Sequence, residues 1–80
     1  AQRYEAVCLR LLEQKQFDKV SIWCERLVQQ YPEELASYTC RLKLYFMSND
    51  KENFFTVMDQ LKKSDIIIDN ETLELIRVFS

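Results

Sequence analysis

Three cysteines, Cys8, Cys24 and Cys40, carry the most reactive side chains of the sequence. Thiols serve as nucleophiles, metal ligands or disulfide partners. Their equal spacing of sixteen residues lacks the close pairs of zinc motifs, and an odd number cannot be fully paired in disulfides. A nucleophilic cysteine would need an orienting partner, and the sequence offers no identifiable one. We therefore expect buried, reduced thiols and a reducing compartment, most simply the cytoplasm.

Two missing residue types restrict the remaining chemistry. The 80 residues include no His, the commonest general base, and no Gly, which phosphate-binding loops require. Most familiar enzyme constellations are therefore excluded. A carboxylate pair or a Cys nucleophile remains conceivable, but neither has an identifiable orienting partner. We expect that the segment is not an enzyme and has no cofactor or metal ion.

Charge and length limit the possible partners. Lys and Arg number 11, Asp and Glu number 13, and the interleaved signs give a formal charge of −2. Such a chain has no basic face for a phosphate backbone, so no direct nucleic-acid binding is expected. The aliphatic run from Ile66 to Ile68 is far too short to cross a bilayer, so no membrane partner is expected. We interpret residues 1–80 as a single domain excised from a longer chain.

Apolar residues recur every three or four positions, which is typical of amphipathic helices. Five helices are predicted: residues 3–14, residues 17 to about 31, a third that begins near Pro32, a fourth after residues 48–50, and a fifth from residue 69 or 70. Pro32 suits the first turn of a helix, and Ser48, Asn49 and Asp50 suit a turn with a helix cap. Short connections favour antiparallel neighbours. The fold class is therefore all-α.

Aromatic side chains could anchor an interface at Trp23, Tyr31, Phe46 and Phe55, but an aromatic residue at helical spacing is more often part of the core. Trp23 lies on the apolar stripe of the second helix. Phe54 and Phe55 are adjacent, and neighbouring helix residues point about 100° apart. Both rings cannot fully face one core, so one of them is expected to meet another repeat, a partner or another copy of the chain.

The first two helices superpose on the next two at an offset of 34 residues. This pattern resembles the tetratricopeptide repeat. The characteristic positions of the family hold Tyr4, Val7, Cys8, Leu11, Val20, Cys24, Leu27 and Pro32. The resemblance implies antiparallel helix-pair repeats, a fragment of an α-solenoid, with repeat one at residues 1–34, repeat two at 35–68 and a closing helix at 69–80. The second repeat departs from the pattern at Arg41, Leu42, Phe54 and Ile66.

The same helix-pair design suggests two other families. The stretch from Tyr38 to Leu73 also resembles the bacterial transcriptional activator domain, which would make the segment a regulatory domain of a multidomain transcription regulator. Residues 58–76 are similar in outline to a pentatricopeptide repeat, which reads single-stranded RNA. The negative charge and the repeat number of two argue against the latter.

The tetratricopeptide resemblance implies a protein-interaction or oligomerisation module. Its partners would be a protein or peptide, neighbouring domains of the same chain, or a second copy in a homodimer. The groove positions of the family fall on Glu5, Leu9, Leu12, Thr39, Lys43, Phe46, Leu73 and Arg77. Lys43 and Arg77 occupy equivalent places, so together they could hold a carboxylate. Two solvated basic residues on exposed helix faces remain the other interpretation.

Overall fold

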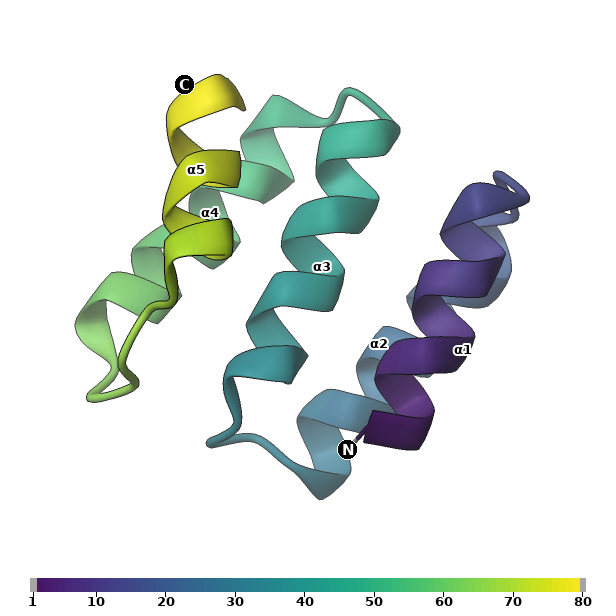
Figure 1. Ribbon diagram of the computed structural model, residues 1–80, viewed down its shortest axis with the longest axis horizontal. Coiled ribbons are helices and arrows are strands. Elements are labelled where there is room, and N and C mark those ends of the chain that lie inside the picture. Colours follow the sequence, from purple (N-terminus) through teal and green to yellow (C-terminus); the bar gives the residue numbers. More distant parts are fainter. Residues whose placement is uncertain (1, 80) are drawn as a thin grey trace.

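The computed structural model describes residues 2–79, which form five α-helices and no strand (Figure 1). The helices are α1 (Gln2–Glu13), α2 (Phe17–Gln30), α3 (Leu35–Met47), α4 (Lys51–Lys63) and α5 (Asn70–Phe79). The predicted all-α class with about five helices is confirmed.

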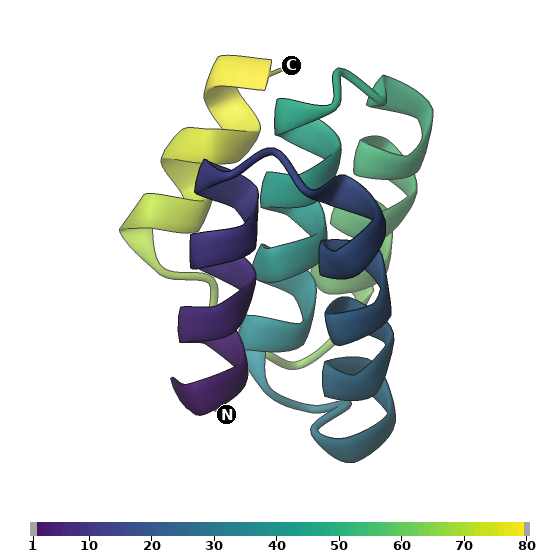
Figure 2. The same ribbon diagram turned by 90° about the vertical axis from the view of Figure 1, so that its right-hand side faces the viewer.

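Helix α3 is the centre of the arrangement, since it contacts α1, α2, α4 and α5. The helices α1, α3 and α5 lie side by side in one layer, and α2 and α4 form a second layer behind them (Figures 1 and 2). Contacts between α1 and α3, and between α3 and α5, therefore join neighbouring helices of the first layer.

Two clusters of buried side chains form the core. The cluster between α1, α2 and α3 consists of Cys8, Leu12, Val20, Cys24, Leu27, Cys40 and Leu44. The second cluster consists of Leu42, Phe54, Val57 and Leu61, against which Ile76 and Phe79 of α5 pack. Phe54 is fully buried whereas Phe55 is 37% exposed, so only one of these rings is fully enclosed by the core. Trp23 is half-buried against the first cluster.

The end of α1 has a left-handed residue that is not glycine. Lys15 has a φ of 59°, and its N–H donates to the Leu12 carbonyl at 3.0 Å. The next N–H, of Gln16, donates to the Leu11 carbonyl at 3.0 Å. These two bonds form a Schellman motif, which satisfies the last carbonyls of a helix.

The turn predicted at residues 48–50 joins α3 to α4 and repeats this geometry. Asn49 also has a φ of 59°, and its N–H donates to the Phe46 carbonyl at 3.2 Å. The Asp50 N–H donates to the Tyr45 carbonyl at 2.8 Å, and the Asp50 carboxylate accepts the Asn53 N–H at 3.3 Å. Asp50 is therefore the N-cap of α4.

Two other residues were predicted to start helices, Pro32 and Asp69, and the prediction is correct only for Asp69. Pro32 does not begin a helix: it lies in a turn closed by the Glu34 N–H and the Tyr31 carbonyl, 3.2 Å apart, and α3 starts only at Leu35. Asp69 does cap α5, because its carboxylate accepts the Thr72 N–H at 2.8 Å. Thr72 of α5 is buried, while Val78 of the same helix is 64% exposed.

Candidate functional site

A mostly apolar hollow of about 250 Å³ lies between α1 and α3. Its lining residues are Leu9, Leu12, Glu13, Lys43, Phe46 and Met47. Leu12 is almost fully buried and forms the floor, whereas Leu9 and Met47 are 42% and 43% exposed. One cation and one carboxylate accompany four apolar side chains, so the hollow offers apolar burial together with a charged contact.

Four of the eight residues expected from the family resemblance meet in this hollow: Leu9, Leu12, Lys43 and Phe46. Their positions follow from the 34-residue offset, since Leu9 corresponds to Lys43 and Leu12 to Phe46. Glu13 and Met47 were missed, although they are also equivalent at that offset and follow the predicted pair along each helix.

The other four expected residues do not line the hollow. Glu5 and Thr39 are half-buried, and the Thr39 hydroxyl donates to the Ala36 carbonyl at 3.3 Å. Leu73 and Arg77 are exposed on α5.

Lys43 and Arg77 each pair with a different glutamate. The Lys43 Nζ lies 3.4 Å from an Oε of Glu71, which brings α3 and α5 together at the edge of the hollow. The Arg77 guanidinium donates to both carboxylate oxygens of Glu74, at 2.6 and 2.8 Å, within α5. Lys43 and Arg77 therefore belong to two separate ion pairs. The Glu71 carboxylate is largely exposed, so a ligand carboxylate can compete for Lys43 at low cost.

The three cysteines come together in the first core cluster as buried free thiols. Hydrogen bonds to Cys8, followed by burial, raise the pKa of Cys24 and of Cys40. The same contacts with Cys24 and Cys40 lower the pKa of Cys8, and burial opposes that change. Within residues 2–79, no group of three His, Cys, Asp or Glu side chains is placed to hold a metal ion. The thiols are best understood as packing residues.

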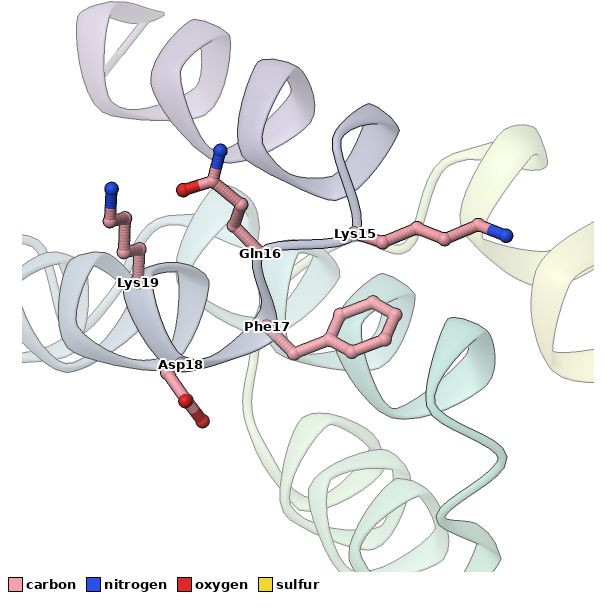
Figure 3. A pocket seen from close by; sticks show the side chains of 5 residues that line it. All are labelled: Lys15, Gln16, Phe17, Asp18 and Lys19. Carbon is pink, nitrogen blue, oxygen red and sulfur yellow. The ribbon is translucent and has the colours of Figure 1, made fainter.

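Another hollow, of about 330 Å³, lies at the turn between α1 and α2. Its lining is the continuous stretch of residues 15–19. Gln16 and Lys19 point to one side, whereas Lys15 and Asp18 point away from them (Figure 3), so the four polar groups do not converge on one ligand position. This hollow is a feature of the turn and has the character of neither a catalytic nor a binding site.

Comparison of the chain with protein-family models, with curated proteins and with solved structures finds no match. Among the helices of residues 2–79, none has the length and apolar character needed to span a membrane.

Proposed function

We propose that the chain is a tetratricopeptide-like module that binds a segment of another polypeptide in the hollow between α1 and α3. The observation that carries this function is the convergence of Leu9, Leu12, Phe46 and Met47 beside Lys43. An apolar concavity with a few placed polar groups suits peptide recognition. The module holds or positions its partner and performs no reaction itself.

The repeated architecture supports this function. Lys15 and Asn49 end equivalent helices with the same backbone motif, and α1, α3 and α5 lie in one layer. In helical-repeat proteins such a layer forms the binding surface. The buried free thiols support a reducing compartment, such as the cytoplasm.

The ligand expected for this hollow is a short amphipathic segment. Its apolar side chains would cover Leu9 and Met47 and reach Leu12, while an acidic side chain would replace Glu71 as the partner of Lys43. A random peptide library displayed on phage and selected against the whole 80-residue chain tests this. Selected sequences should be enriched in apolar residues with at least one Asp or Glu.

Two matched variants test where the selected peptides bind. Leu9→Asp places a charge on the rim of the hollow, whereas Ile22→Asp places it on α2, where Ile22 is 53% exposed and lines no described hollow. Fluorescence anisotropy should show about tenfold or more weaker binding to Leu9→Asp and little change for Ile22→Asp. Equal binding to Leu9→Asp and wild type, or failure to select any peptide, would contradict this function.

The exposed apolar residues of α5 favour a second candidate role. Leu73 and Val78 are exposed, although neighbouring residues of the same helix are packed against α3 and α4. Coverage of α5 by an adjacent domain or a second copy would suit an oligomerisation segment or a regulatory domain of a transcription regulator. Measurement of self-association separates this role from peptide binding.

A further inference from the structure

Three aromatic rings surround a second hollow, of about 500 Å³, at the start of α1 and the end of α2. Its lining residues are Arg3, Tyr4, Val7, Trp23 and Tyr31. The ring centroids of Tyr4 and Trp23 are 5.4 Å apart with planes inclined by 53°. Those of Tyr4 and Tyr31 are 6.0 Å apart with planes inclined by 60°. This aromatic hollow shares no lining residue with the hollow between α1 and α3.

The rings of the aromatic hollow are held in position. All three are half-buried and pack against the first core cluster. The Tyr4 hydroxyl donates to the Gln30 side-chain carbonyl at 3.0 Å, which ties the start of α1 to the end of α2. At these separations the rings pack against one another at an angle, and each ring has a polar group at its tip. A ligand would therefore meet preformed apolar surfaces bordered by hydrogen-bonding groups.

Two arginines adjoin the aromatic hollow. Arg3 is one of its lining residues, and the guanidinium carbon of Arg26 lies 5.0 Å from the ring centroid of Trp23. None of the five lining residues is acidic. Aromatic cages also recognise quaternary ammonium groups. Here a cationic ligand would meet two arginines, one of which already covers the indole, so electrostatics favour a neutral or acidic ligand.

We propose that the aromatic hollow binds a proline-rich peptide in the polyproline II conformation, with an acidic residue next to the prolines. Proline rings can pack on the aromatic surfaces that line the hollow, and this extended helix loses little conformational entropy on binding. Its backbone carbonyls make no internal hydrogen bonds and can accept them from the Tyr31 hydroxyl, the Trp23 indole N–H and Arg3. The acidic residue pairs with Arg3.

The single tryptophan of the chain provides a direct measurement, because Trp23 lies in the aromatic hollow. The whole 80-residue chain is titrated with an oligoproline peptide that has an aspartate at each end. A saturable change in tryptophan fluorescence is expected. The matched peptide with alanine in place of proline should give no saturable change at the same concentrations, since it lacks the preformed helix.

Three variants locate the contact. Tyr31→Leu removes one ring and should weaken binding by about tenfold, as loss of an aromatic anchor does. Arg3→Glu reverses an exposed charge without disturbing the core. Arg3→Glu should weaken binding of the aspartate-flanked peptide by about tenfold and leave binding of an uncharged oligoproline peptide unchanged. Phe55→Ala removes an exposed ring outside the aromatic hollow and should bind as wild type does.

Several outcomes would overturn this site. They are the absence of a saturable change with either proline peptide, equal binding of the alanine peptide, and binding of tetramethylammonium in preference to the proline peptides. If Tyr31→Leu does not fold by circular dichroism, Arg3→Glu still decides the matter, because Arg3 is exposed. Leu9→Asp should bind the proline peptide normally, so this site and peptide binding between α1 and α3 can fail independently.

Discussion

Lys15 and Asn49 occupy the same structural position 34 residues apart. Both have a φ of 59°, and each N–H donates to the carbonyl three residues earlier, at 3.0 Å for Lys15 and 3.2 Å for Asn49. The residue after each donates to the carbonyl five residues earlier. The offset that relates the apolar residues thus also relates a backbone motif. Apolar periodicity alone does not require this agreement, which supports a repeated helix pair.

Glycine at these two positions is expected to stabilise the fold. A non-glycine residue with positive φ pays a steric cost of about 1 kcal/mol, which glycine avoids. Lys15→Gly should raise the free energy of unfolding by about 0.5–1 kcal/mol in urea melts. Asn49→Gly should raise it by less, because asparagine tolerates this conformation.

Arg10→Gly is the control for these substitutions, because Arg10 is exposed within α1 and has no positive φ. It should lower the free energy of unfolding by about 1 kcal/mol. If Lys15→Gly is as destabilising as Arg10→Gly, the left-handed conformation of Lys15 is incorrect.

The core was largely predictable from the sequence, because helix packing depends on where apolar residues recur. Leu27 holds a characteristic position of the resembled repeat and is fully buried, as are Phe54 and Leu61, which are spaced seven residues apart along the chain. The left-handed Lys15 was not predictable, since lysine has no preference for positive φ and the motif depends on where the helix stops. Pro32 was assigned to a helix start because proline suits both a first turn and the turn that precedes a helix.

The candidate site was less predictable than the core. Family positions identify which residues share a face, but they do not show which neighbours compete for a charged side chain. Arg77 pairs with Glu74 one turn away on α5, whereas Lys43 reaches Glu71 on another helix. The aromatic hollow combines residues from α1, α2 and the turn after α2, so periodicity within one helix could not reveal it.

Adjacent phenylalanines in α4 should differ sharply in their effect on stability. Phe54 is fully buried, with its ring centroid 4.6 Å from that of Phe79, so Phe54→Ala should cost about 3–5 kcal/mol. Phe55→Ala removes the same atoms from a partly exposed position and should cost clearly less, about 1 kcal/mol. Urea melts of both variants provide the measurement. Equal losses would mean that α4 is rotated relative to its position here.

Asp69 should make stability depend on acidic pH. Hydrogen bonds from the Thr72 side chain, and then from its backbone N–H, lower the pKa of Asp69. The unfolded chain therefore binds more protons than the folded one near this pKa. The contribution of the ionised Asp69 carboxylate to the free energy of unfolding is complete above the unfolded pKa of about 3.9. It is lost as pH falls through the lower folded pKa.

Two substitutions separate the cap at Asp69 from its charge. Asp69→Ala should cost about 1 kcal/mol at neutral pH, as loss of an N-cap does. Asp69→Asn keeps a capping side chain and should reduce the loss of stability between neutral pH and about pH 3. Urea melts across this range measure both effects. An unchanged pH dependence in Asp69→Asn would rule out the role given to the carboxylate.

The three thiols should react only when the protein opens. Cys8, Cys24 and Cys40 are buried, and hydrogen bonds to Cys8, followed by burial, raise the pKa of the other two. Labelling with an aromatic disulfide reagent should be slow in the native protein and complete after denaturation. Ser21→Cys supplies an exposed thiol on α2 as a control and should react at once. Rapid native labelling of Cys8 would contradict the packing of α1 on α2.

Self-association should depend on the exposed side of α5. Phe79 is unsuitable as a probe, because its ring packs 5.1 Å from Phe46 and 4.6 Å from Phe54, so Phe79→Asp would damage the core. Val78 is the better probe, since it is 64% exposed. If a second copy covers α5, Val78→Asp should shift sedimentation equilibrium at micromolar concentrations towards monomer. Gln60→Asp adds the same charge at an exposed position of α4 and should leave the monomer–dimer equilibrium unchanged. A wild-type chain that sediments only as a monomer would exclude the homodimer.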